Sequence, residues 1–446
     1  MKYHIWTEGC QMNVADSQRI SSALEEMGYS ATRSPEDADV IILNTCVVRQ
    51  SAENKAYGRL SSLKPLKDEK PNLVINLMGC LVGVRPDPRL IARFPYVDVF
   101  SAPSDPLPLI EHLVQKNHHA EHQSETARRF ALMDGDLVLP GFDHSKEVCA
   151  YLPVVLGCSH ACTYCVIPYR RGVEESRPFE VVMQEARNLV ANGVKEITLL
   201  GQIVDRYGLD LASGQHLPVL LRELNQLEGL DRIRFLTSHP NWMTEELLQT
   251  VAELPKVCPH IEVPVQAGDN AVLANMKRGY TREDYIQLVG KIRQYLPEGS
   301  IATDIIVGFP GETEEQFQQT YDLLEELRLD VVHLARYSSR PNTVATRRMK
   351  DDVPEGEKMR RFRLLEKQQE CITGEINQNY LDQTVEVLFE AKSKKRWRGR
   401  TPTNKLVFAE SSENLLGKTV PVKIFWTGPW SMIGEIAHPG ENDPRL

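Results

Sequence analysis

The chain has 446 residues, too many for one ordinary domain, and its hydrophobic fraction of 41% can fill more than one core. The net charge of -9 excludes a uniformly basic nucleic-acid binder, but not a local basic patch. Neither a long apolar segment at the start nor an apolar stretch of about 18 residues occurs, so we expect no membrane span. We therefore expect a cytoplasmic protein whose nine cysteines stay reduced and serve as metal ligands or catalysts.

The first part of the chain, residues 1–116, predicts an open α/β domain. Apolar runs in KYHIWTEGC, ADVIILNTC and PNLVINLMGC predict three strands, which end at Cys10, Cys46 and Cys80. Residues 14–27 have helical periodicity. Because parallel strands bring their carboxyl ends to one edge of a sheet, we expect the three thiols to converge on a metal centre. The alternative is three unrelated buried cysteines.

The polar, irregular residues 117–143 predict a linker between domains. His118, His119 and His122 lie in it, but neither a cysteine nor a strand frames them. A solvated linker is therefore the interpretation, rather than a metal site.

A second group of cysteines follows the apolar residues 151–157, in the segment GCSHACTYC. It places three thiols on the loop after a predicted strand: Cys158, Cys162 and Cys165. Zinc sites usually close with four ligands in paired spacing, whereas three cysteines leave one iron of a cubane iron–sulfur cluster open. The alternatives are a structural metal knuckle and free buried thiols. Three other cysteines have no partner at ligand spacing: Cys149, Cys258 and Cys371.

Residues 144–375 alternate strands with amphipathic helices in about six units, short of the eight of a closed barrel. Residues 376–440 contain about five short strands, which predict a small β-barrel. The segment Lys392–Arg400 holds six Lys or Arg and no acid. Basic charge and an aromatic ring suit single-stranded RNA, through phosphate contacts and base stacking.

The residues expected to bind RNA are Lys394, Lys395, Arg396, Trp397 and Arg398. The alternative for this segment is a solvated charged hairpin. The helical basic stretch Lys358–Arg363 is the next candidate for the RNA surface.

These motifs resemble a known family. The CxxxCxxC spacing resembles the signature of the radical S-adenosylmethionine (SAM) superfamily, and EGCQMNVADS, LNTCVVRQSAENKAYGRL and MGC resemble the N-terminal domain of the tRNA methylthiotransferases. The sequence Cys10-Gln11-Met12-Asn13 resembles the branch that acts on isopentenyladenosine. The last module resembles a TRAM domain, an RNA-binding barrel. The resemblance implies a Rossmann/flavodoxin-like three-layer domain, a partial (βα)6 radical SAM core and a TRAM barrel.

The resemblance also implies two [4Fe-4S] clusters, one on each cysteine trio, and two uses of SAM. One SAM provides the methyl group, and the other yields a radical that removes a hydrogen from carbon 2 of isopentenyladenosine. This base is next to the anticodon, at position 37 of tRNA, and receives a methylthio group. The ring hydrogen is not usefully acidic, so acid–base catalysis cannot remove it.

By the same resemblance we expect a set of SAM contacts at strand ends: Tyr164, Gly201, Gln202, Gln266, Asp304, Gly308 and Tyr337. Arg171 and Arg177 are expected near the substrate. The family usually has other residues at four positions of this chain, where hydrogen bonds are therefore expected to differ: Ile203, Asp205, Ala267 and Asn342.

The partners implied are the anticodon stem-loop of tRNA, a low-potential flavodoxin- or ferredoxin-type electron donor and a sulfur source, with the protein a monomer. Three other functions stay open. They are a threonylcarbamoyladenosine-type methylthiotransferase, an iron–sulfur electron carrier, and an RNA-binding protein whose clusters are structural.

Overall fold

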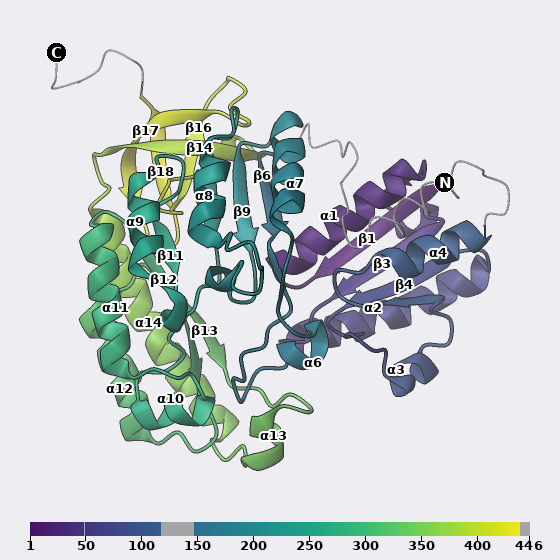
Figure 1. Ribbon diagram of the computed structural model, residues 1–446, viewed down its shortest axis with the longest axis horizontal. Coiled ribbons are helices and arrows are strands. Elements are labelled where there is room, and N and C mark those ends of the chain that lie inside the picture. The colour runs from purple at the N-terminus through teal and green to yellow at the C-terminus, as the bar shows by residue number, and fades with distance from the viewer. Residues whose placement is uncertain (49, 117–146, 438–446) are drawn as a thin grey trace.

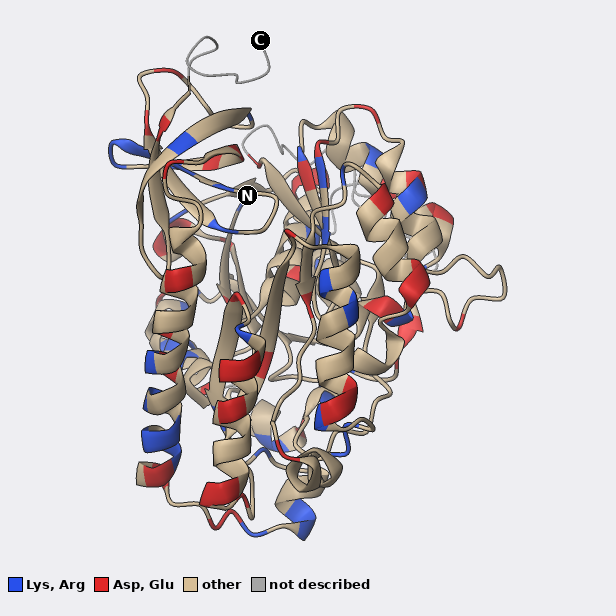
Figure 2. Cartoon of the chain, turned by 90° about the vertical axis from the view of Figure 1, so that its left-hand side faces the viewer, with Lys and Arg blue, Asp and Glu red and all other residues tan. Residues whose placement is uncertain are grey.

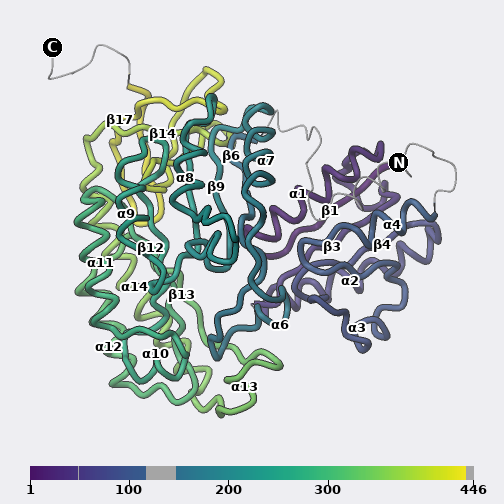
Figure 3. The backbone as a smooth tube through the Cα atoms, in the orientation of Figure 1, coloured from purple at the N-terminus to yellow at the C-terminus, as the bar shows by residue number. Residues whose placement is uncertain are grey.

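The computed structural model describes residues 1–48, 50–116 and 147–437. An N-terminal α/β domain lies beside a central α/β core, and a small β-barrel covers one end of that core (Figure 1). Figure 3 traces the same path and shows the short helix α6 (Ile167–Arg171) between the first two parts. The fold class predicted from the sequence is confirmed. Within the described ranges, no helix is both long and apolar enough to cross a membrane.

The N-terminal sheet has five parallel strands in the flavodoxin-like order β2-β1-β3-β4-β5. The strands are β1 (Lys2–Glu8), β2 (Ser30–Ala31), β3 (Val40–Thr45), β4 (Val74–Gly79) and β5 (Val99–Ser101). Successive residues of β3 point to opposite faces, so Val40 and Ile42 pack with one pair of helices and Ile41 and Leu43 with another. The helices are α1 (Gln11–Glu26) and α4 (Leu107–Lys116) on the first face, and α2 (Gln50–Glu69) and α3 (Pro88–Arg93) on the second.

The core contains two parallel sheets of three strands each, ordered β6-β9-β10 and β11-β12-β13. Their bounds are β6 (Cys149–Pro153), β9 (Glu196–Leu200), β10 (Arg232–Phe235), β11 (His260–Glu262), β12 (Ser300–Val307) and β13 (Val331–Arg336). A parallel bridge between Ile233 and Val257 links the two sheets, so the six strands form an incomplete barrel, as predicted. The short β7 (Val155–Leu156) and β8 (Glu175–Ser176) pair with each other.

Helices on the outside of the core share one hydrophobic cluster with these strands. They are α7 (Phe179–Ala191), α8 (Leu217–Asn225), α9 (Glu245–Glu253), α11 (Arg282–Tyr295), α12 (Glu314–Leu327) and α14 (Glu355–Gln378). Thr281 and Thr313 form capping boxes at the starts of α11 and α12, which fixes where these helices begin. Two shorter helices, α10 (Asn270–Met276) and α13 (Val344–Arg348), lie near the cysteine loop of the core.

The C-terminal barrel closes in the strand order β14-β15-β16-β18-β17. The strands are β14 (Thr384–Ser393), β15 (Arg396–Arg400), β16 (Leu406–Glu410), β17 (Thr419–Thr427) and β18 (Met432–Ile436). The barrel is attached to the amino ends of the core strands. Arg234 of β10 donates to the carbonyl oxygens of Thr401 and Pro402, both at 2.7 Å, and Ser300 Oγ of β12 donates to the carbonyl of Thr403 at 2.8 Å.

Arg234→Ala should destabilise this junction strongly. Arg234 Nε donates to Glu196 Oε1 at 2.8 Å, and Glu196 is only 4% exposed, so the substitution leaves a buried carboxylate without its partner. We expect the free energy of unfolding, measured by urea denaturation, to fall by about 3–5 kcal/mol. The exposed pair of Arg222 and Glu253 provides the control, because Arg222→Ala should have little effect. Equal decreases in the two variants would show that burial of the Arg234 pair is unimportant.

Candidate functional site

The three cysteines of the N-terminal domain lie at one edge of its sheet. Cys10, Cys46 and Cys80 follow β1, β3 and β4, which are neighbours in the strand order. Gly9 allows the first two loops to approach, because a Cβ there would lie 2.9 Å from the Cβ of Cys46. Burial raises the pKa of Cys80 to about 11, and the nearby thiols of Cys46 and Cys10 add to this increase. The convergence expected from the sequence is therefore present.

Arg171 of α6 reaches from the core to this group of thiols. Its Nε donates to Cys80 Sγ at 3.2 Å, and its Nη2 forms an ion pair with Asp16 Oδ2 at 3.2 Å. Ser104 Oγ donates to the other oxygen of Asp16 at 2.5 Å. The guanidinium lowers the pKa of Cys80 and so opposes the effect of burial on that thiol.

The loop between β7 and α6 carries the second trio: Cys158, Cys162 and Cys165. Gly157 makes the turn into this loop with a φ of +63°, and a Cβ there would lie 1.9 Å from the carbonyl oxygen of Val173. The backbone N–H of Thr163 donates to the carbonyl of Met276 at 3.0 Å and ties the loop to α10. Only glycine fits at position 157, and the loop is held on both sides.

Two side chains that the sequence did not single out contact Cys162. Arg278 Nη1 donates to its Sγ at 3.2 Å, and His160 Nδ1 lies 3.0 Å from the same sulfur. Burial lowers the pKa of His160 to about 4, with Arg278 adding to the effect, so the ring is neutral near pH 7. Arg278 lies 116 residues after Cys162, and no local sequence signal connects the two.

The surroundings of both trios fit iron–sulfur clusters. Burial raises the pKa of Cys158 to about 11 and that of Cys165 to about 12, so these thiols ionise only when a metal replaces the proton. Among the described residues, no group of three or more His, Cys, Asp or Glu side chains is arranged to bind a single metal ion. A cluster distributes its cysteine ligands over different irons, and N–H donors to the sulfurs tune it.

The residues assigned to SAM by the family resemblance surround the same edge of the core. They are Tyr164 in the cysteine loop, Gly201 and Gln202 after β9, Gln266 after β11, Asp304 within β12, Gly308 after β12 and Tyr337 after β13. Gln266 has a φ of +79°, a strained backbone conformation for glutamine of the kind that occurs at functional sites. Asp304 lies in the middle of its strand and not at the end as expected, and the contacts of all these residues with SAM stay predictions.

Three buried polar atoms at this edge have no hydrogen-bond partner among the described residues: Asp205 Oδ1, Ser238 Oγ and His239 Nε2. Leaving such an atom unsatisfied costs about 1–3 kcal/mol. Burial raises the pKa of Asp205 to about 7, although the N–H of His239 donates to its Oδ2 at 2.9 Å. A bound molecule with several polar groups, as SAM has, would satisfy these atoms, so the edge fits such a cofactor.

Positions where this chain departs from the family pattern have local explanations. Ile203 packs against Cys158 in a small hydrophobic cluster. Ala267 is fully buried in the core. Asn342 has a φ of +71°, a left-handed conformation that asparagine adopts more readily than other residues with a side chain, so it can replace glycine there.

The side chain of Arg177 has a structural role, and its place near the substrate stays a prediction. Its Nη1 donates to the carbonyl of Pro153 at 2.7 Å, and its Nη2 pairs with Glu185 Oε2 at 2.5 Å. Both groups are buried, so Arg177 joins β6 to α7 inside the core.

Two residues of the basic stretch Lys358–Arg363, Lys358 and Arg361, are buried in the core. The side chain of Lys358 lies against Gly308, and its Nζ is 5.2 Å from the centre of the Tyr337 ring. Arg361 is buried and bonded to carboxylates. Arg360 and Arg363 are exposed, so the stretch stays the next candidate for the RNA surface through these two residues alone.

On the barrel, the predicted RNA-binding residues separate into two groups. Lys394, Lys395, Arg396 and Arg398 are exposed, on and beside the turn that joins β14 to β15. Trp397 is only 5% exposed and belongs to the hydrophobic core of the barrel. A base cannot stack on a ring in that position. The predicted stacking role of Trp397 is therefore wrong, and the ring is part of the barrel core.

Exposed aromatic side chains occur elsewhere on the barrel, where the sequence did not predict them. Phe425, Trp426 and Trp430 are 53%, 47% and 59% exposed. A β-bulge between Ile424 and Trp426 breaks the alternation of β17, so that two successive aromatic residues face solvent. Figure 2 shows both basic and acidic segments on the barrel, as on the helices of the core.

The three other cysteines lie away from both trios. Cys149 begins β6 and Cys258 precedes β11, at the amino ends of the strands, and Cys371 is exposed on α14.

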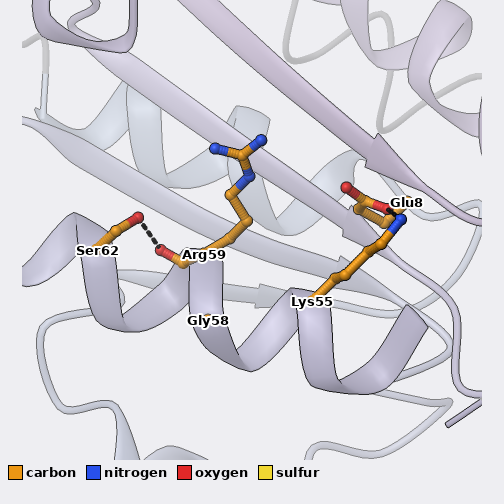
Figure 4. Close-up of a pocket in the computed structure, with 5 residues that line it drawn as sticks. All are labelled: Glu8, Lys55, Gly58, Arg59 and Ser62. Carbon is orange, nitrogen blue, oxygen red and sulfur yellow. Dashed lines mark hydrogen bonds and ion pairs between the residues drawn. The ribbon is translucent and has the colours of Figure 1, made fainter. Parts of the chain in front are cut away.

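A hollow of about 470 Å³ lies between the end of β1 and α2, and no cysteine lines it (Figure 4). In it Lys55 pairs with Glu8 at 3.8 Å, and Arg59 lies 4.5 Å from the centre of the Trp6 ring, so both cations are engaged within the domain.

Comparisons with solved structures agree with the fold. A radical S-adenosylmethionine methyltransferase, TsrM from Kitasatospora setae, superposes with a TM-score of 0.56 at 15% identity, covering 77% of this chain and 76% of that one. A cobalamin-dependent radical enzyme, OxsB, superposes with a TM-score of 0.51 at 12% identity, covering 82% of this chain and 55% of that one. At these identities the likeness concerns the fold alone.

Sequence comparisons identify the family. Family models match residues 2–102 (Uncharacterized protein family UPF0004), 152–324 (Radical SAM superfamily) and 378–437 (TRAM domain). A tRNA-2-methylthio-N(6)-dimethylallyladenosine synthase of Roseiflexus sp. (strain RS-1) is 46% identical over 100% of this chain and 91% of its own length. The protein of that name from Chloroflexus aurantiacus is 46% identical over 97% of this chain and 91% of its own. The chain therefore belongs to the tRNA-2-methylthio-N(6)-dimethylallyladenosine synthase family of the radical SAM superfamily.

Proposed function

We propose that this protein is a radical SAM methylthiotransferase that adds a methylthio group to carbon 2 of isopentenyladenosine at position 37 of tRNA. One observation carries the proposal most directly. Two cysteine trios occupy the carboxyl edges of two separate α/β units, and Arg171 connects them through its contact with Cys80. An electron carrier would need neither a SAM pocket nor a basic C-terminal barrel, and the family of the sequence relatives favours the enzyme.

The cysteines would hold two [4Fe-4S] clusters: Cys10, Cys46 and Cys80 the first, and Cys158, Cys162 and Cys165 the second. When bound, these clusters and SAM supply the one-electron and methylthio chemistry that an unactivated ring carbon requires. The protein positions them. Arg278 holds the sulfur of Cys162 in place, and Ile203 and Ile167 shield Cys158 from water.

The domain boundaries that we propose are residues 1–116 for the methylthiotransferase domain, 144–375 for the radical SAM core and 376–440 for the TRAM barrel. The linker between the first two, residues 117–143 with its three histidines, lies outside the described residues. The proposed partners are the tRNA anticodon stem-loop, a low-potential flavodoxin- or ferredoxin-type electron donor and a sulfur source. We propose a cytoplasmic monomer.

The reaction can be tested by mass spectrometry of tRNA nucleosides. A tRNA that carries isopentenyladenosine without the methylthio group is incubated anaerobically with the reconstituted protein, SAM and a reductant. We expect 2-methylthio-isopentenyladenosine from the wild type and from Cys371→Ser, and none from Cys165→Ala, which lacks a ligand of the core cluster. Methylthiolation instead of a second tRNA, which carries threonylcarbamoyladenosine and is tested in parallel, would identify the related branch of the family. Intact SAM and unchanged tRNA would contradict an enzymatic role.

Iron content tests the ligand assignment. Two cubanes require about eight iron atoms per chain. Replacing Cys158, Cys162 and Cys165 with Ala should leave about four, and replacing all six proposed ligands should leave none. Variants of the spare thiols, Cys149→Ala, Cys258→Ala and Cys371→Ser, should retain all the iron. A reconstituted wild type that holds only four iron atoms contradicts the two-cluster assignment.

The β14–β15 hairpin is the proposed phosphate-binding surface. Replacing Lys394, Lys395, Arg396 and Arg398 with Ala should weaken tRNA binding, and the slope of log K against log salt should fall by about 0.7–0.9 for each phosphate that is no longer neutralised. Fluorescence anisotropy at several salt concentrations measures both quantities. Lys418→Ala, at another exposed lysine of the barrel, is the control and should change neither much. Unchanged affinity and slope in the four-fold variant would place the RNA surface elsewhere.

A further inference from the structure

Val166 packs in one hydrophobic cluster with Cys80 and Leu81, and the buried side chain of Arg171 also connects the two cysteine loops. Arg171 ends α6, the helix that follows Cys165 directly, so its backbone belongs to the core cluster loop. Its Nε donates to Cys80 Sγ in the N-terminal domain at 3.2 Å. Side-chain exposures of 2% for Arg171 and 0% for Asp16 show that this contact is closed to water.

The geometry at Arg171 uses the planar fork of the guanidinium. One edge of the fork contacts Cys80, while Nη2 pairs with Asp16 and Nη1 lies 3.5 Å from Ser104 Oγ. Asp16 belongs to α1, the helix that begins just after Cys10. Lysine offers a single point charge and cannot make these contacts together. The arrangement therefore places one oriented N–H and one fixed positive charge at a cysteine sulfur.

From these contacts we propose that Arg171 is a positioning residue that sets the reduction potential of the N-terminal cluster. The inference rests on the proposed function, because it requires Cys80 to be a cluster ligand. Hydrogen bonds to ligand sulfurs and nearby positive charge stabilise the more negative, reduced state of a cluster. Arg171 thus raises the reduction potential. It also makes this potential depend on the position of the core loop, since α6 and Cys165 are adjacent.

The test uses the full chain with Cys158, Cys162 and Cys165 replaced by Ala, so that one cluster remains. Dithionite delivers one electron to the oxidised cluster, no bond forms or breaks, and EPR measures the reduced fraction at defined potentials. Arg171→Met in this background should lower the midpoint. At a fixed potential, the ratio of reduced to oxidised clusters should be about tenfold lower, which corresponds to 59 mV for one electron. Arg171→Lys should lie between Arg171→Met and the parent.

Arg170→Met is the matched control. It removes an equal charge from the same helix, but Arg170 Nη1 approaches the carbonyl of Leu81, at 3.5 Å, instead of a sulfur. Its midpoint should remain near that of the parent. Equal shifts in the two variants, or no shift in Arg171→Met with full iron content, would overturn the proposal. If Arg171→Met does not fold, the proposal is tested with Arg171→Lys. An unchanged midpoint in that variant would also overturn the proposal. A parent that binds no iron would instead contradict the proposed ligand set.

Discussion

Both cysteine trios depend on one property of parallel β-sheets, namely that every strand delivers its following loop to the same edge. In the N-terminal domain, β1, β3 and β4 are adjacent, so cysteines placed just after each strand meet without further folding of the loops. The switch in strand order between β1 and β3 opens the crevice in which such folds place ligands. In the core, the same rule gathers one cysteine loop and the ends of five other strands. Arg171, which follows the core loop, contacts Cys80 and so brings the two edges together.

Buried arginines make the junctions between the three parts of the chain. Arg171 joins the N-terminal domain to the core, and Arg234 joins the core to the barrel. Each is paired with a buried carboxylate and bonded to further groups of the neighbouring part. Such a pair contributes little net stability when compared with apolar packing, but removing one member leaves an unpaired buried charge. The junctions therefore favour one relative position of the parts, as a site shared between two domains requires.

The sequence predicted the placement of the cysteines because strand ends and glycine turns are local features. It predicted the role of Trp397 wrongly, although the alternation Arg396-Trp397-Arg398 on a strand indicates that the ring points inward. Arg171 and Arg177 could not be distinguished, since both follow the cysteine loop, and only packing shows that one contacts Cys80 and the other a carboxylate of α7. The contact of Arg278 with Cys162 could not be predicted from local sequence patterns, because only the folded chain brings these two residues together.

The barrel and the core cysteines lie at opposite ends of the core strands, which separates binding from chemistry. Arg400 and Thr401 contact the core, and the hairpin turn with Lys394 and Lys395 lies at the other end of β15, directed away from it. If RNA phosphates bind at this hairpin, the base that reacts must lie elsewhere, at the other end of the core strands. Under the proposed function, the stem of a bound tRNA contacts the barrel while an unpaired loop base reaches the cysteine edges. Binding energy from the remote contact can then hold that base in position for reaction. Substitutions at the hairpin should consequently lower affinity, whereas substitutions at the cysteine edges should lower the turnover of bound tRNA.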